Sequence, residues 1–198
     1  MKLNYQWPLP SQPRPIAIIG SGGIVKDAHL PAYQKAEFKV LGVYDINPEQ
    51  SAKIANLWNL KAFGSLDSLI SSAQSQNAVF DLALPPSAVS DVLEQLPEHA
   101  TVLIQKPMGS NLEEAKRIKA ICERKKLTAA VNFQLRFSPM MLALKDAMSK
   151  GHLERILDLE VHLNLEASWE LFPFLKKMER VEIAVHSIHY LDLIRSFL

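Results

Sequence analysis

Residues 15–24 run Pro15-Ile16-Ala17-Ile18-Ile19-Gly20-Ser21-Gly22-Gly23-Ile24. An apolar segment of strand length is followed by three glycines, and a segment of helical character comes next. This order is typical of the first turn of a dinucleotide-binding βαβ unit, where glycines let the backbone approach a pyrophosphate and the helix offers its unpaired N–H groups. The complete fingerprint has a third small residue at position 25, where this chain has Val25, so an ordinary turn is the alternative.

The next apolar segment supports the cofactor interpretation. Residues 38–44 are rich in β-formers and end at Asp45, where a carboxylate would accept hydrogen bonds from the adenosine ribose. An aspartate at a strand end could also simply begin a turn. A carboxylate repels a 2′-phosphate, and neither Arg nor Lys directly follows Asp45, so the sequence favours NAD over NADP.

The composition is that of an ordinary soluble globular protein, with 198 residues, 48% hydrophobic residues and a formal charge of +1. The balanced charge predicts no nucleic-acid partner. No apolar run is long enough for a bilayer, and the first residues lack the apolar core of a signal peptide, so we expect no membrane partner and a cytoplasmic location. The single cysteine, Cys122, falls on the apolar stripe of a predicted helix, where we expect packing.

Strands and helices alternate through the first two thirds of the chain and are joined by short loops. This pattern predicts an α/β fold, a Rossmann-type doubly wound parallel sheet covered on both faces. The expected strands are residues 16–19, 38–44, 60–63, 78–84, 101–104 and 128–131, and the expected helices are residues 24–36, 48–57, 67–72, 87–96 and 112–122. We therefore expect a proline-rich extended arm at 1–15 and a dinucleotide-binding domain at 16–137.

A different pattern begins after Phe137. A helix is expected over residues 139–150, and residues 157–165 then alternate strictly between apolar and polar side chains. Period two predicts a half-buried strand of an open antiparallel sheet, the start of an α+β domain over residues 138–198. Because one strand cannot make a stable sheet alone, we expect a truncated chain or one that depends on a partner. The aromatic residues of 169–178 could line a substrate pocket or merely pack.

Lys106 carries the first candidate for catalysis. It follows the strand at 101–104 within Gln105-Lys106-Pro107, and open α/β sheets bind ligands outside the carboxyl ends of their strands. A lysine there can donate a hydrogen bond to a substrate hydroxyl or carbonyl and stabilise developing negative charge. A solvated surface lysine before a turn-forming proline is the alternative.

Two histidines share the last predicted helix, which covers residues 182–197. His186 and His189 are three residues apart, so they lie on neighbouring parts of one face. A histidine can act as the general base that removes a hydroxyl proton while hydride leaves carbon; for His186 we favour a structural role. Their spacing with Asp192 matches no strong zinc motif, so we expect no metal. Arg136, near the domain crossover, could face substrate or pair with a carboxylate.

Together these residues resemble the Gfo/Idh/MocA family, which includes glucose–fructose oxidoreductase and inositol dehydrogenase. The resemblance is carried by residues 16–33, 43–49, 105–114, 136–139 and 188–192. It implies an NAD(P)-dependent oxidoreductase that acts on a CH–OH group of a sugar, polyol or related substrate. In full-length form the family implies a homo-oligomer formed through the second domain.

The resemblance also implies roles for single residues. Lys106 matches the family's strand-end lysine and His189 its proton-transferring histidine. The candidate substrate contacts are Lys106, Arg136, His186 and His189, and a structural role is the alternative for either histidine. The family's glycine loop matches Gly20 and Gly22, and its ribose-binding acid matches Asp45. We also expect Gly23, Ile24, Pro85 and Lys106 to contact the cofactor.

Two positions depart from the family pattern. The usual Glu-Lys-Pro has Gln105 in place of the glutamate, and Val185 replaces an aspartate four residues before His189. These departures keep open a non-catalytic dinucleotide-binding protein of the same family. A methyltransferase, which shares the glycine-rich first turn and the acidic second strand end, is a weaker alternative, because Lys106 and His189 argue against it.

Overall fold

The computed structural model describes residues 2–166, 175 and 180–198. The chain divides into two compact units. Pro10–Asn132 forms one unit, called here the sheet unit, and Met1–Leu9 joins Phe133–Leu198 in the other, called here the helical unit. Every strand of the described residues lies in the sheet unit.

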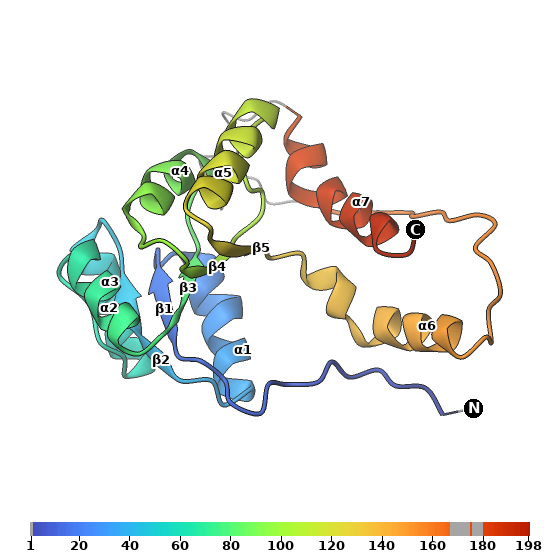
Figure 1. Ribbon diagram of the computed structural model, residues 1–198, viewed down its shortest axis with the longest axis horizontal. Coiled ribbons are helices and arrows are strands. Elements are labelled where there is room, and N and C mark those ends of the chain that lie inside the picture. Colours follow the sequence, from blue (N-terminus) through green and yellow to red (C-terminus); the bar gives the residue numbers. More distant parts are fainter. Residues whose placement is uncertain (1, 167–174, 176–179) are drawn as a thin grey trace. The chain divides into compact units, whose positions relative to one another are not determined.

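The sheet unit is built on five parallel strands (Figure 1). The strands are β1 (Ile16–Ile19), β2 (Val40–Tyr44), β3 (Val79–Leu82), β4 (Thr101–Ile104) and β5 (Thr128–Val131). They lie in the order β2-β1-β3-β4-β5. A single bridge between Val43 and Ala62 extends the sheet beyond β2, so the strand expected at 60–63 is reduced to one residue pair. Counting that bridge, the order along the sheet is the doubly wound Rossmann order, which confirms this part of the predicted fold class.

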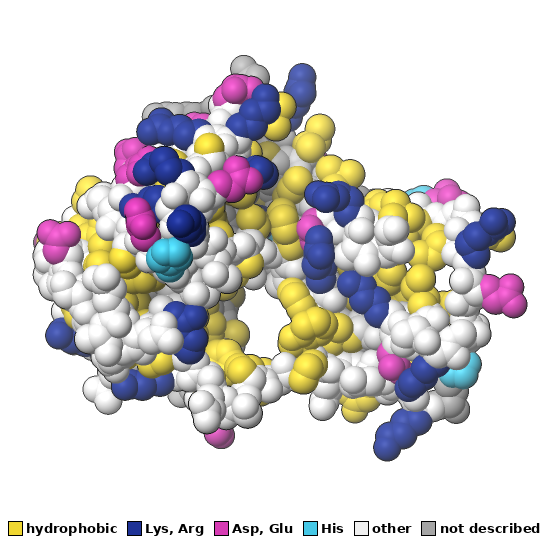
Figure 2. All heavy atoms as spheres, in the orientation of Figure 1, with side chains coloured by type: hydrophobic (Ala, Val, Ile, Leu, Met, Phe, Trp, Pro, Cys, Tyr) yellow, Lys and Arg dark blue, Asp and Glu magenta, His cyan; other side chains and the backbone are white. Residues whose placement is uncertain are grey.

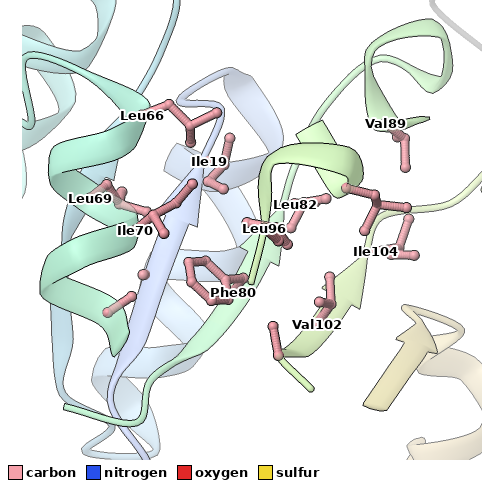
Figure 3. Packing of buried hydrophobic residues seen from close by; sticks show 14 of the residues in the cluster. Ile19, Leu66, Leu69, Ile70, Phe80, Leu82, Val89, Leu96, Val102 and Ile104 are labelled. Carbon is pink, nitrogen blue, oxygen red and sulfur yellow. The ribbon is translucent and has the colours of Figure 1, made fainter. Parts of the chain in front are cut away.

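Alternate residues of β1 point to opposite faces of the sheet, and each face has its own core. Ile16 and Ile18 pack with the helical residues after the glycine loop (π-helical η1, Val25–His29, then α1, Leu30–Lys35) and with α2 (Pro48–Trp58). Ala17 and Ile19 pack with α3 (Leu66–Ser75), α4 (Pro86–Gln95) and α5 (Leu112–Arg124). Figure 3 shows this second core, where Leu69 and Ile70 of α3 lie beside Ile19 and Phe80.

Arg14 fixes the start of β1 to two neighbouring strands. Its guanidinium donates to the carbonyl oxygen of Asn77 at 2.6 Å and to that of Ala78 at 3.1 Å, just before β3. It also donates to the Thr101 hydroxyl of β4 at 2.8 Å. The end of the proline-rich segment is therefore bound to the amino edge of the sheet.

The helical unit contains four short helical elements in its described part. They are η2 (Gln134–Phe137), α6 (Pro139–Ser149), π-helical η5 (Ile183–Ser187) and α7 (Ile188–Arg195). The first residues of the chain pack on this unit: the Trp7 ring meets the edge of Phe137 with 5.0 Å between centroids. The backbone N–H of Asn4 also donates to Asp146 at 2.8 Å.

The expected antiparallel strand at 157–165 is wrong for the described structure. Residues 154–166 form no strand, and Leu157 and Leu165 are 79% and 55% exposed. A strand needs a neighbour for its backbone N–H and C=O groups, and no segment within the described residues pairs with this one. The segment 169–178, considered above for a substrate pocket, lies outside the described residues except for Leu175.

The surface of the sheet unit carries charges of both signs. Figure 2 shows acidic and basic side chains intermixed over α4 and α5, where ion pairs join Lys116 to Glu113 and Arg124 to Glu94. Exposed pairs of this kind add little stability. Among the described residues, no helix is long and apolar enough to cross a membrane.

Candidate functional site

The glycine loop lies between β1 and a helix that covers residues 23–35. Gly20 has φ +93°, and a Cβ atom there would meet the Ala83 carbonyl oxygen at 2.4 Å. A Cβ on Gly22 would meet nothing within 4 Å, and Gly22 and Gly23 are exposed. Gly20 is therefore required by the close passage of the chain beside β3, whereas Gly22 and Gly23 leave room beside the backbone for a ligand. Ile24, half-buried, packs on the core beneath the loop.

Asp45 lies directly against this loop. Its Oδ2 accepts hydrogen bonds from the Ser21 backbone N–H at 2.7 Å and from the Ser21 hydroxyl at 2.9 Å. Its Oδ1 accepts from the Asn47 backbone N–H at 2.9 Å. The Gln50 side chain also donates to the Ser21 carbonyl oxygen at 2.8 Å, so α2 and the glycine loop are tied together. The structure thus brings together the loop and the acid that the sequence singled out for one cofactor.

Lys106 leaves the carboxyl edge of the sheet after β4. Gln105, which precedes it, is buried, and its backbone N–H donates to the Leu82 carbonyl oxygen of β3 at 2.9 Å. The Gln105 side-chain oxygen accepts from the Lys106 backbone N–H at 3.2 Å, and the Lys106–Pro107 peptide is cis. Burial lowers the pKa of the Lys106 ammonium below its ordinary value. Pro85, exposed at the start of α4, follows the neighbouring strand β3.

A buried polar cluster joins β3 to the helical residues that follow the glycine loop, and no local sequence pattern indicates it. Asp81 of β3 is fully buried, and its Oδ2 lies 2.7 Å from His29 Nδ1 and 2.9 Å from the Tyr33 hydroxyl. Burial, together with the nearby Asp81 carboxylate, raises the pKa of Tyr33 far above its ordinary value. His29 Nε2 lies 3.4 Å from the side-chain nitrogen of Asn132, which follows β5.

The helical unit holds the remaining candidates. Arg136 donates to both carboxylate oxygens of Asp192, which confirms the carboxylate pairing proposed as one alternative for Arg136. His189 is buried. Its ring and that of Phe133 meet edge to face, with 6.0 Å between the ring centroids. His186 Nδ1 lies 2.7 Å from a Glu182 carboxylate oxygen.

Lys106 belongs to the sheet unit, whereas Arg136, His186 and His189 belong to the helical unit. Val185, where the family has an aspartate, is buried. Within residues 2–166, 175 and 180–198, no group of three or more His, Cys, Asp and Glu side chains is arranged to hold a metal ion.

Comparison with known proteins places the chain in a family. Residues 14–133 match the GFO_IDH_MocA model, described as an oxidoreductase family with an NAD-binding Rossmann fold. The chain belongs to the Gfo/Idh/MocA oxidoreductase family. This membership favours an oxidoreductase over the methyltransferase that a glycine-rich first turn also allowed.

Curated relatives are similar to the chain over much of its length. The chain is 32% identical to glucose-6-phosphate 3-dehydrogenase of Bacillus subtilis over 74% of its own length and 41% of that protein. It is 27% identical to UDP-N-acetylglucosamine 3-dehydrogenase of Acidithiobacillus ferrooxidans over 63% of its length and 40% of that protein. The chain therefore spans about two fifths of the length of these relatives.

Solved structures share the fold. The WlbA dehydrogenase from Bordetella pertussis, in complex with NADH and UDP-GlcNAcA, superposes with a TM-score of 0.69 at 21% identity, over 94% of this chain and 59% of that one. UDP-N-acetylglucosamine 3-dehydrogenase GnnA from Acidithiobacillus ferrooxidans gives a TM-score of 0.55 at 25% identity, over 67% of this chain and 42% of that one. The likeness to WlbA bears on the fold alone.

Proposed function

We propose that this chain binds NAD in preference to NADP, as part of an oxidoreductase that transfers a hydride between the cofactor and a hydroxyl or carbonyl group of a sugar, polyol or related substrate. One observation carries the proposal: the Asp45 carboxylate lies against the glycine loop, bound to the Ser21 N–H and hydroxyl. A carboxylate in this place accepts hydrogen bonds from a ribose hydroxyl and repels a 2′-phosphate.

The residues present fit a dinucleotide. A Cβ on Gly22 would meet nothing within 4 Å. The N–H groups of Gly23 and Ile24, at the start of the helix over residues 23–35, have no carbonyl partner inside that helix. We assign cofactor binding to the loop, to Asp45, and to the residues that follow β3 and β4 at the carboxyl edge. The set is Gly20, Gly22, Gly23, Ile24, Asp45, Pro85 and Lys106.

NAD, when bound, supplies a nicotinamide C4 that accepts or donates hydride. In our proposal Lys106 donates a hydrogen bond to the substrate oxygen, and its partly desolvated ammonium stabilises negative charge there. His189 takes the hydroxyl proton as a general base. Because Arg136 is bound to Asp192, we assign it to holding α7 in place. His186 lies 2.7 Å from a Glu182 carboxylate oxygen, so we assign it a structural role in preference to substrate contact.

The names of two relatives support the substrate class. Glucose-6-phosphate 3-dehydrogenase and UDP-N-acetylglucosamine 3-dehydrogenase are both named for oxidation at a sugar carbon. The second candidate function is binding of the dinucleotide without turnover. It is favoured by Val185, which is buried and carries no carboxylate where the family has an aspartate beside its histidine.

Titration with NADH and with NADPH tests the proposal, with energy transfer from Trp58 and the other tryptophans to the nicotinamide as the signal. We expect saturable binding with the lower Kd for NADH. Absence of binding by a folded chain would refute cofactor binding, and a preference for NADPH would refute the role of Asp45. Hydride exchange with glucose 6-phosphate or a polyol separates an enzyme from a non-catalytic binder. In a full-length active form, Lys106→Met should then reduce turnover far more than NAD affinity.

A further inference from the structure

A chain of three polar side chains runs from inside the sheet unit to the end of β5. Asp81 of β3 is fully buried and lies 2.7 Å from His29 Nδ1 through its Oδ2. The opposite ring nitrogen of His29, Nε2, lies 3.4 Å from Asn132 Nδ2. His29 is itself buried, with 6% of its surface exposed. Nothing in the proposed reaction uses these three residues.

With Asp81 ionised and the His29 ring neutral, the direction of each hydrogen bond follows from the donors and acceptors present, and it agrees with the amide nitrogen of Asn132 facing His29 Nε2. An ionised carboxylate only accepts, so His29 Nδ1 must carry the hydrogen that it shares with Asp81. In the neutral ring Nε2 is then an acceptor, and it requires a donor from Asn132, which is the amide nitrogen Nδ2. A flipped amide would place the Asn132 oxygen against the Nε2 lone pair. Asp81 and His29 therefore select one orientation of the Asn132 amide.

Asn132 lies at the edge of the sheet where ligands of this fold bind. Its backbone N–H donates to the Ile104 carbonyl oxygen of β4 at 2.8 Å, and Ile104 pairs in register with Val131 of β5. Lys106 follows Ile104 by two residues. Asn132 therefore lies at the carboxyl edge of the sheet, next to β4, the strand that Lys106 follows.

The Asn132 oxygen is the atom that remains available. Its amide nitrogen is bound to His29, and among the described residues no side chain or backbone N–H donates to Oδ1. Oδ1 is also not among the buried polar atoms that lack a partner. An oriented carbonyl oxygen at this edge suits a ligand group that carries N–H donors.

We propose that Asn132 orients the nicotinamide of the bound cofactor by accepting a hydrogen bond from its carboxamide NH₂, and that His29 and Asp81 are positioning residues that hold Asn132 in this orientation. The inference rests on the proposed binding of NAD. Anchoring the carboxamide fixes which face of the nicotinamide ring meets the substrate.

Calorimetric titration of the chain with NADH and with ADP-ribose tests the inference. ADP-ribose has the same pyrophosphate and adenosine ribose but no nicotinamide, so it reports on the glycine loop and Asp45 alone. Asn132→Ala should raise the Kd for NADH by about 5- to 10-fold, the effect of one lost hydrogen bond. The Kd for ADP-ribose should stay within about twofold, since no contact with ADP-ribose is removed.

Variants of His29 separate positioning from packing. His29→Met places an apolar side chain of similar length at this position and removes both hydrogen bonds. It should raise the Kd for NADH as much as Asn132→Ala does. His29→Gln retains one donor and one acceptor and should restore most of the affinity. Tyr33→Phe is the matched control, because it removes the other donor to Asp81 Oδ2 and leaves the His29–Asn132 contact; its Kd for NADH should match wild type.

Each of the following outcomes overturns the inference. If Asn132→Ala binds NADH like the wild type, or weakens NADH and ADP-ribose equally, Asn132 does not contact the nicotinamide. If His29→Gln is as weak as His29→Met, the orientation argument is wrong. A wild-type chain that binds neither ligand overturns the proposed function and this inference together, whereas wild-type binding with unchanged variants overturns this inference alone.

Discussion

Gly20→Ala should destabilise the sheet unit strongly, while Gly22→Ala in the same loop should not. Gly20 has φ +93°, in a region that L residues adopt only with strain of about 1–2 kcal/mol. Its added methyl group would lie 2.4 Å from the Ala83 carbonyl oxygen, which is backbone and cannot rotate away. Moving that backbone adds about 1–3 kcal/mol, as overpacking of a core does.

The stiffer unfolded chain of an alanine variant offsets these two effects by about 0.4–1 kcal/mol. We therefore expect Gly20→Ala to lower the free energy of unfolding by about 2–4 kcal/mol, a large part of the 5–15 kcal/mol typical of a domain. At Gly22 a methyl group meets nothing within 4 Å. The unfolding free energy of Gly22→Ala should therefore stay within about 0.5 kcal/mol of wild type.

Urea unfolding followed by tryptophan fluorescence measures both free energies, and titration with NADH adds the functional comparison. Gly22→Ala should fold normally and lose at least about tenfold in NADH affinity, because its methyl group occupies the space left for the pyrophosphate. A Gly20→Ala variant within 0.5 kcal/mol of wild type would show that the loop does not need this conformation. A Gly22→Ala variant with unchanged affinity would place the phosphates elsewhere.

Three further perturbations follow from the site. Asp45→Ala should raise the Kd for NADH by about tenfold and that for NADPH less, because it removes an acceptor for the ribose and a charge that repels phosphate; an unchanged preference in paired titrations contradicts this. Acylation of Lys106 should begin at lower pH than that of an ordinary lysine, because only the neutral amine reacts and burial lowers the pKa of Lys106. Peptide mass spectrometry measures the acylated fraction at each pH, and a pH profile like that of an exposed lysine would contradict the prediction. Arg136→Gln should lower the unfolding temperature and cost about 1–3 kcal/mol, because it leaves the buried Asp192 carboxylate without its ionic partner; Asp192→Asn in the same background should recover part of the loss.

The elements of the sheet unit were predictable because their signals are local. An apolar run such as 101–104 and the glycines after β1 specify a strand and a turn within a few residues, and the observed strands β1, β3, β4 and β5 fall in the expected segments. The period-two segment at 157–165 shows the limit of such signals. Alternation defines two faces, but a strand also needs a neighbour, and no local pattern supplies one.

The Asp81 cluster could not be predicted for a related reason. A carboxylate inside the four-residue strand Val79–Leu82 indicates that a buried partner must exist. It does not indicate that the partner is His29, 52 residues away along the chain. Arg136, near the domain crossover, was expected either to face substrate or to pair with a carboxylate, but no local pattern indicates that the partner is Asp192, 56 residues away along the chain.

The contacts of Asp45 have a consequence for how fast a cofactor can come and go. A carboxylate has room for about four hydrogen-bond donors, and Ser21 and Asn47 already supply three. A ribose diol brings two donors, so one resident donor must leave. The Ser21 hydroxyl is the one that can, because it is a side-chain donor and the other two are backbone N–H groups. Binding at this carboxylate is then an exchange of one hydrogen bond for another. The same hydroxyl can return to the carboxylate when a ribose leaves, which lowers the barrier to release of a bound dinucleotide.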